Sequence, residues 1–95
     1  MKYYNKGIAA HLEAILKLLD DDHLVFENIQ GVGPIDIITV NKKTGKVIYY
    51  DAKCDRERAH KKRPQTKIQK QLGVKNFYVN LRKRTYRLEG KVGKL

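Results

Sequence analysis

The chain has few cysteines and prolines, and it has no long apolar run. Among its 95 residues there is one cysteine, two prolines and no tryptophan. The single cysteine, Cys54, excludes an internal disulfide and a cysteine-based zinc cluster. No apolar run approaches the roughly 20 residues that cross a bilayer, and the start, MKYYNKG, lacks the apolar core of a signal peptide. We therefore expect an intracellular protein with no membrane partner.

Acidic residues are also scarce. The chain carries 10 Asp and Glu against 21 Lys and Arg, which gives a formal net charge of +11. An excess of this size in so short a chain indicates a polyanionic partner, with nucleic acid as the first candidate and an anionic membrane as the second. The length predicts a single domain over residues 1–95.

The apolar pattern predicts two helices and at least four strands. The first helix is expected over 7–20, where four apolar residues recur at helical spacing: Ile8, Leu12, Ile15 and Leu19. A second helix is expected after Pro64, ending at Gly73. The expected strands span 23–29, 34–40, 46–54 and 74–80, and 85–90 is a fifth strand or an extended tail. The order α-β-β-β-α-β predicts an α/β fold with a mixed central sheet flanked by helices.

The segment NKKTG between the second and third strands is typical of a tight hairpin loop. If Val40 and Val47 flank this loop as partners, Asp36 lies opposite Asp51. Lys53 then shares their face, because side chains two apart on a strand point the same way. A shift of one residue, or a bulge near the loop, would change the direct partner. The sequence therefore predicts three charged side chains on one face of a hairpin.

Two neighbouring carboxylates repel each other unless a cation lies between them. Mg²⁺ prefers oxygen ligands, commonly uses one or two carboxylates, and retains waters that can attack a phosphodiester. We expect Asp36 and Asp51 to bind Mg²⁺, with the carbonyl oxygen of Ala52 as a third ligand and Mn²⁺ as a substitute metal. Lys53 would assist deprotonation of a metal-bound water or stabilise charge on the phosphorus. The alternative is an ordinary Asp51–Lys53 ion pair, with Asp36 capping a turn.

The residues Gly33-Pro34-Ile35 and Asp36, followed by Asp51-Ala52-Lys53, resemble the PD-(D/E)-x-K nuclease signature. The opening KGIAAHLEAILKLL followed by GVGPIDIITV is similar to Holliday-junction resolvases of archaeal and viral type. The resemblance implies a restriction endonuclease-like αβββαβ core, Mg²⁺-dependent DNA cleavage, and the cytoplasm of a prokaryotic or virus-infected cell. It also implies that a glutamate on the first helix, here Glu13, completes the catalytic metal site. Asp51 stands where many relatives have glutamate.

Basic residues that follow the predicted catalytic strand are candidates for phosphate contacts. The predicted DNA-binding residues are Arg56, Arg58, Lys61, Lys62, Arg63, Lys67, Lys70, Arg82 and Arg84. One of Gln65 and Gln69 is a candidate for a supporting contact to the site or the substrate. The three histidines show no metal-binding spacing, and no role is predicted for them.

The expected function is a structure-selective endonuclease acting on branched DNA. A four-way junction needs two paired nicks, and one small subunit supplies one site, so we expect a homodimer. The residues predicted for its interface are Tyr3, Tyr4, Phe77 and Tyr78. One alternative is a sequence-specific endonuclease of homing or restriction type. The other is a non-catalytic nucleic-acid-binding module in which the carboxylates are structural.

Overall fold

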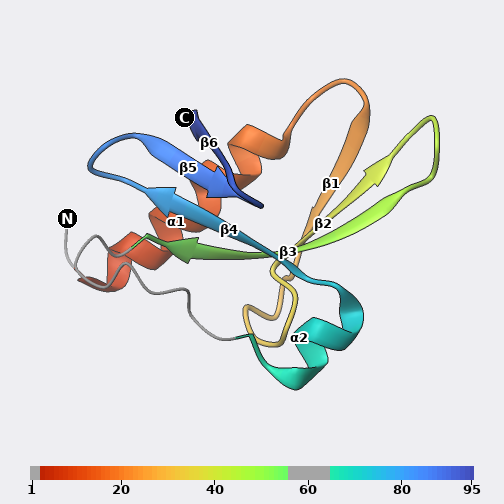
Figure 1. Ribbon diagram of the computed structural model, residues 1–95, viewed down its shortest axis with the longest axis horizontal. Coiled ribbons are helices and arrows are strands. Elements are labelled where there is room, and N and C mark those ends of the chain that lie inside the picture. Colours follow the sequence, from red (N-terminus) through yellow and green to blue (C-terminus); the bar gives the residue numbers. More distant parts are fainter. Residues whose placement is uncertain (1–2, 56–64) are drawn as a thin grey trace.

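A computed structural model describes residues 3–55 and 65–95 of the chain. Its elements are α1 (Tyr3–Leu18), β1 (His23–Glu27), β2 (Ile37–Asn41), β3 (Val47–Cys54), α2 (Lys67–Leu72), β4 (Lys75–Asn80), β5 (Thr85–Leu88) and β6 (Lys91–Lys94). Within these residues the strands form one six-stranded sheet in the order β1-β2-β3-β4-β5-β6 (Figure 1). The predicted α/β class, with a mixed sheet and flanking helices, is confirmed. Neither of the helices in the described ranges is long and apolar enough to cross a membrane.

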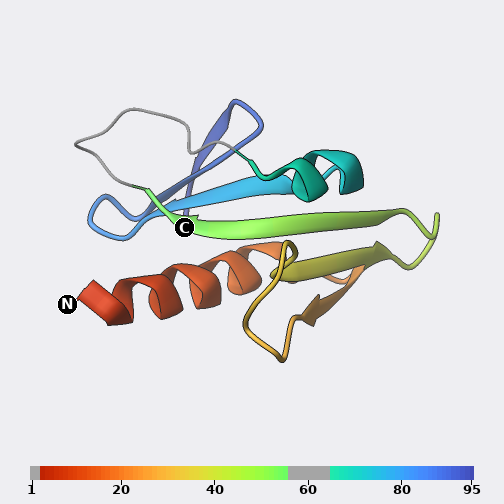
Figure 2. The same ribbon diagram turned by 90° about the horizontal axis from the view of Figure 1, so that it is seen from below.

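The sheet consists of two antiparallel meanders joined by one parallel pair. The strands β1, β2 and β3 form the first meander, and β4, β5 and β6 form the second. The parallel pair is β3 with β4. In Figure 2, α1 lies along one face of this sheet and α2 lies on the other side. The described chain thus follows the predicted α-β-β-β-α-β order, with two more strands after it.

The hairpin between β2 and β3 has the predicted register. Val40 pairs with Val47, and Ile37 pairs with Tyr50. The loop is fixed locally, because the side-chain oxygen of Asn41 accepts hydrogen bonds from the backbone N–H groups of Lys43 (2.9 Å) and Thr44 (3.0 Å). Such an Asx turn closes the loop through the side chain of its own first residue, and the N–H of Lys42 also donates to the carbonyl of Asp22 (2.8 Å).

The core lies between α1 and the sheet. Small residues of α1, Ala10 and Ala14, are buried against Ile37 from β2, Phe77 from β4 and their neighbours. Phe77 stacks on Tyr86 with 5.3 Å between ring centroids. The small side chains allow the helix backbone to approach the sheet closely, so the large aromatic rings fill the remaining volume.

This packing turns several of the larger apolar residues at α1 outward. Ile8, Leu12 and Leu16 of the helix, and Leu19 just after it, are each 53–63% exposed. Of the predicted apolar repeat, Ile8, Leu12 and Leu19 are therefore mostly exposed, whereas Ile15 packs against the core together with Ala10, Ala14 and Leu18.

The prediction that Phe77 and Tyr78 supply an interface surface is wrong, because both side chains are buried within the subunit. Phe77 is 1% exposed because it belongs to the core. Tyr78 is also buried, and the guanidinium of Arg87 lies 4.6 Å from the centre of its ring. The side chains of Tyr3 and Tyr4 lie outside the part of the structure that is described.

Local signals fix both ends of α2. The hydroxyl of Thr66 accepts a hydrogen bond from the backbone N–H of Gln69 (3.3 Å), and the side-chain oxygen of Gln69 accepts one from the N–H of Thr66 (3.1 Å). This reciprocal pair is a capping box. Gly73 ends the helix as predicted, with a left-handed φ of 69° that favours glycine.

The last strand, β6, was not predicted. It pairs with β5, and Gly93 lies opposite Tyr86. A Cβ atom at position 93 would lie 2.5 Å from Cε1 of the Tyr86 ring. Glycine at this position therefore allows β6 to pass over the ring that closes one side of the core.

Candidate functional site

Asp36, Asp51 and Lys53 lie together, as the hairpin register predicts. Ala52 packs with the core on the α1 face, so its neighbours Asp51 and Lys53 point to the opposite face. The Nζ atom of Lys53 is 3.4 Å from Oδ2 of Asp51, and the two side chains are 13% and 17% exposed. Oδ2 of Asp36 accepts a hydrogen bond from the N–H of Ala52 at 2.9 Å. Two carboxyls and one ammonium group therefore share a partly buried position beside β3.

The backbone of Asp36 is held on both sides. Its N–H donates to the carbonyl of Tyr50 (2.9 Å), and its carbonyl accepts from the N–H of Asn28 (2.8 Å). The side-chain amide of Asn28 also donates to the carbonyls of Val32 (2.7 Å) and Ile35 (2.9 Å). Asn28 thus fixes the loop that precedes Asp36. No role was predicted for Asn28, since one asparagine near two glycines gives no distinctive signal.

Gln69 connects α2 to the site. Its side chain is buried, and its Nε2 atom donates to Oδ2 of Asp51 (3.0 Å) and to the carbonyl of Pro34 (3.1 Å). Its Oε1 atom belongs to the capping box at Thr66. Of the two glutamines considered, Gln69 therefore reaches the site, whereas Gln65 donates to the carbonyl of Val74 (2.6 Å).

The carboxyl of Asp36 is hard to ionise. The pKa of Asp36 is raised from 3.8 to about 6. Burial is the largest cause, and the neighbouring carboxyl of Asp51 is the second. The N–H of Ala52 and the charge of His11 act in the opposite direction. His11 therefore lies close enough to influence the site, although no role was predicted for it. Its Nε2 atom is 3.0 Å from Oε2 of Glu27.

This arrangement offers oxygen atoms that could serve as ligands for a divalent cation. The N–H and C=O of one residue in an extended strand point to the same side, so the carbonyl of Ala52 points to the side where its N–H meets Asp36. Residues 3–55 and 65–95 contain no group of three or more His, Cys, Asp or Glu side chains placed so that together they could hold a metal ion. A site here would use two carboxylates and a backbone oxygen, a set that suits Mg²⁺ because this ion keeps several waters.

Glu13 lies elsewhere in this structure. It is on α1, which covers the sheet face opposite Asp51 and Lys53, and its Oε1 atom is 2.7 Å from Nη2 of Arg84. The predicted metal ligand and a predicted DNA-binding residue are thus partners of one another. The metal role of Glu13 and the DNA role of Arg84 stay predictions.

The other predicted DNA-binding residues fall into two groups. Lys67 and Lys70 are exposed on α2, the helix that carries Gln69, and Arg82 is exposed in the turn between β4 and β5. Five more lie outside the described residues: Arg56, Arg58, Lys61, Lys62 and Arg63.

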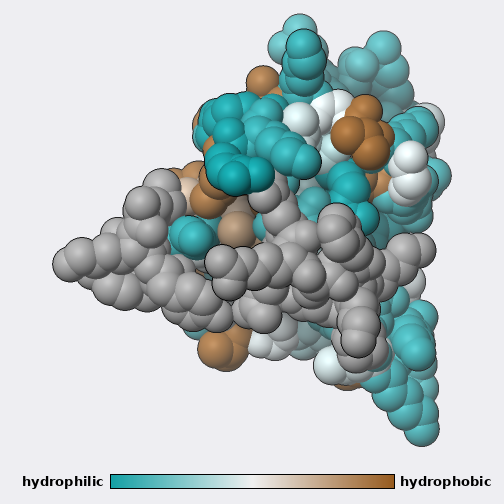
Figure 3. Space-filling view, turned by 60° about the vertical axis from the view of Figure 1, so that its left-hand side comes forward, coloured by the Kyte–Doolittle hydropathy of each residue, from teal (hydrophilic) through white to brown (hydrophobic). Residues whose placement is uncertain are grey.

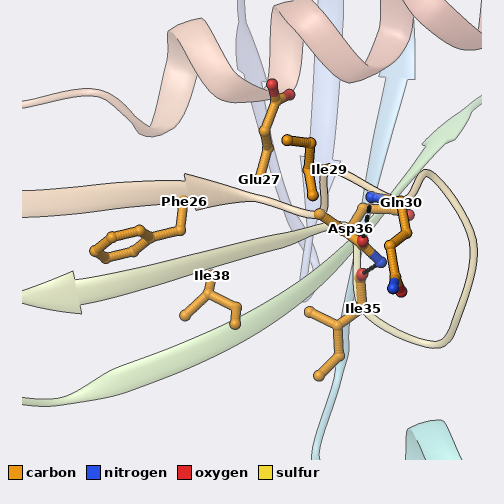
Figure 4. A pocket seen from close by; sticks show the side chains of 8 residues that line it. Phe26, Glu27, Ile29, Gln30, Ile35, Asp36 and Ile38 are labelled. Atoms are coloured by element: carbon orange, nitrogen blue, oxygen red, sulfur yellow. Dashed lines mark hydrogen bonds between the residues drawn. The ribbon is translucent and has the colours of Figure 1, made fainter.

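A hollow of about 370 Å³ is bordered in part by Asp36. Phe26 of β1, Ile38 of β2 and Ile35 from the loop before β2 supply much of its apolar lining (Figure 4). In the same view, Glu27 points away from Phe26 toward the helix. Asp36 therefore adjoins an apolar surface.

Substitution of Asp36 by asparagine tests the interaction between the carboxyls of Asp36 and Asp51, and the test needs no activity assay. Because the pKa of Asp36 is raised to about 6, its contribution to stability is fully present below about pH 3.8 and is lost as the pH rises through about 6. Asparagine keeps an oxygen acceptor for Ala52 and does not ionise. We expect the gain in Tm of Asp36→Asn over wild type, in EDTA, to be larger at pH 7.5 than at pH 4.5.

Thermal unfolding followed by circular dichroism measures this difference. Asp21→Asn, at an exposed turn position, is the matched control and should show no such dependence on pH. A Tm difference for Asp36→Asn that stays constant across the range would contradict the buried carboxyl pair.

Comparisons with protein-family models, with curated proteins and with solved structures give no match for this chain. The geometry of the site and the chemistry of its residues are therefore the basis for a function.

Proposed function

We propose that the protein is a metal-dependent DNA endonuclease with a restriction endonuclease-like core. The observation that carries this proposal is the juxtaposition of Asp36, Asp51 and Lys53 on one face of the sheet. An ordinary exposed ion pair would not need partial burial, a second carboxyl or the side-chain amide of Gln69 from α2. Partly buried carboxyls with a raised pKa are more common at functional sites than on ordinary surfaces.

The donor set fits Mg²⁺, with Mn²⁺ as a substitute. A cation between Asp36 and Asp51 would remove the repulsion that helps raise the pKa of Asp36. When bound, the metal supplies Lewis acidity and a water of lowered pKa. The Ala52 carbonyl would provide a further oxygen, and Gln69 holds Oδ2 of Asp51 in place.

Lys53 supplies the positive charge of the site. Its ammonium group lies 3.4 Å from Asp51 and is largely shielded from water. A buried ammonium group stabilises negative charge that develops on a phosphate more effectively than an exposed one does, because the surrounding dielectric constant is lower. Lys53 would thus contact the reacting phosphate or hold the proton that leaves the attacking water.

The charge of the chain suits a DNA substrate. The net charge is +11, and exposed Lys67 and Lys70 lie on the helix that reaches the site. The described surface seen in Figure 3 is largely hydrophilic, with separate small hydrophobic patches. We propose branched DNA as the substrate and a homodimer as the active form, because resolution of a four-way junction requires two related sites.

A cleavage assay on a panel of DNA structures tests this function. We expect Mg²⁺ or Mn²⁺ to support nicking, EDTA to abolish it, and a four-way junction to be cut in preference to linear duplex, single strand or flap. Reactions in EDTA serve as the control for contaminating metal-independent nucleases.

Two results would favour the alternatives. DNA binding without cleavage in any divalent metal would indicate a non-catalytic binding module. Cleavage of linear duplex at one defined sequence would indicate a sequence-specific endonuclease.

A further inference from the structure

The hollow that Asp36 borders has an aromatic wall. Phe26 is 51% exposed, and it lies with Ile38 and Ile35 on the side of the strands away from α1 (Figure 4). The volume of about 370 Å³ is at the lower end of the range of about 300–1,000 Å³ for small-molecule sites. The hollow therefore suits one planar ring system better than a helix or a peptide segment.

The loop at the hollow is held in shape by hydrogen bonds. The side-chain amide of Asn28 donates to two carbonyls of the segment 32–35, and its Oδ1 atom accepts from the N–H of Gln30 (3.0 Å). The N–H of Gly31 donates to the carbonyl of Asn28 at 3.2 Å. A binding wall that is already ordered loses little conformational entropy when a ligand arrives.

The chemistry of the hollow favours an uncharged aromatic ligand. Its charged side chains are both acidic, Asp36 and Glu27, and no lysine or arginine of residues 3–55 or 65–95 lines it. A phosphate would meet apolar carbon atoms and a carboxyl group, whereas a nucleobase is neutral and planar and stacks on aromatic rings such as Phe26. Gln30 is exposed at the edge of the hollow, and its side-chain amide both donates and accepts hydrogen bonds, as the edge of a base does.

The aromatic wall lies on the same face of the sheet as the proposed catalytic groups. Phe26 pairs with Ile38, and Ile38 pairs with Tyr49. Tyr49 stands two residues before Asp51, and side chains two apart on a strand point the same way. Asp36 belongs to both places, because it borders the hollow and its carboxyl neighbours that of Asp51. A DNA strand with a phosphate at these two carboxyls therefore passes beside the hollow.

We propose that the hollow binds one unpaired nucleobase of the DNA, stacked on Phe26, next to the phosphate that is cleaved. The inference rests on the proposed function, because it takes DNA as the partner and the two carboxyls as the cleavage site. A base is free to enter only where it has left the base-paired stack, as at a branch, a bulge or an extruded nucleotide. The hollow would therefore supply selectivity for branched DNA that contacts to phosphates alone do not carry.

Equilibrium binding in EDTA, which prevents metal-dependent cleavage, tests the base site apart from the nuclease. The probes are three duplexes that differ at one position: a single unpaired thymidine, an abasic residue in its place, or no extra residue. Wild type should bind the thymidine duplex about 10-fold more tightly than the abasic duplex, which is within the range for one base stacked on an aromatic side chain. Phe26→Ala should bind these two duplexes alike, and Gln30→Ala should show a smaller preference than wild type.

Leu24→Ala is the matched control. Leu24 is 46% exposed on the same strand and the same face as Phe26, but it does not line the hollow. Its substitution should leave the preference for the thymidine duplex unchanged.

The outcomes separate the base site from the nuclease. Equal affinity of wild type for the thymidine and abasic duplexes would overturn the base site, and cleavage in Mg²⁺ by the same protein would still support the nuclease. A thymidine preference that Phe26→Ala removes would support the base site, even without cleavage in any divalent metal. Equal weakening of all three complexes by Phe26→Ala, or no binding of any duplex by wild type, would also overturn the base site.

Discussion

Lys53→Met is expected to lower Mg²⁺-dependent DNA cleavage by about 100- to 10,000-fold with little change in DNA affinity. Methionine keeps the apolar stem of the side chain, so the partly buried position stays filled. The ammonium group that lies 3.4 Å from Asp51 is lost. Asp51→Asn should cause a loss of similar size, because it removes a charged metal ligand and retains an oxygen acceptor for Gln69. Single-turnover nicking rates and equilibrium binding measure the two effects separately.

Lys75→Met is the matched control for the loss of a lysine. Lys75 lies on β4 and pairs with Glu89 at 3.1 Å. It is the register partner of Tyr50, a core residue on the α1 face, so it lies away from Asp51. Its substitution should leave the cleavage rate close to wild type. Wild-type nicking by Lys53→Met or by Asp51→Asn would remove the proposed catalytic site.

Phe77→Ala is expected to lower the free energy of unfolding by about 3–5 kcal/mol. Phe77 is 1% exposed, stacks on Tyr86 and lies edge-on to Tyr50. Removing its ring leaves a cavity that the surrounding strands and α1 cannot fill without moving. A loss of this size is a large part of the stability of a small domain.

Urea denaturation followed by circular dichroism measures this loss. Phe26→Ala on β1 is the matched control, because Phe26 is half exposed and its removal should cost about 1 kcal/mol or less. If Phe77→Ala weakened self-association and left the stability of the monomer unchanged, Phe77 would belong to an interface, as the sequence analysis expected.

The features predicted correctly from sequence are those fixed by neighbouring residues. The loop at Asn41 closes through its own side chain, so the register that follows it could be inferred. The alternation of side chains along β3 then placed Asp51 and Lys53 on one face, opposite Ala52. The end of α2 at Gly73 was predicted for the same reason, because a left-handed residue terminates a helix locally.

Features that depend on distant contacts were missed. The orientation of α1 follows from close packing of Ala10 and Ala14 against rings from β3, β4 and β5, and apolar periodicity alone favours the larger residues instead. The pairing of Glu13 with Arg84 joins residues 71 positions apart. The choice of Gln69 over Gln65 likewise depends on how α2 meets β3.

The parallel pairing of β3 with β4 sets an order of events for folding. The two antiparallel meanders close through short loops, so each can form quickly from local contacts. Joining β3 to β4 requires closing a much longer segment of chain, which makes it a slow, non-local step. Asp51 lies on β3 and Asp36 just before β2, both in the first meander, whereas Gln69 lies on α2, within the segment that connects β3 to β4. Asp36 can therefore gain its hydrogen bond from Ala52 within the first meander, whereas Asp51 gains its hydrogen bond from Gln69 only when the connecting segment docks, and the fully ordered site would mark the end of folding.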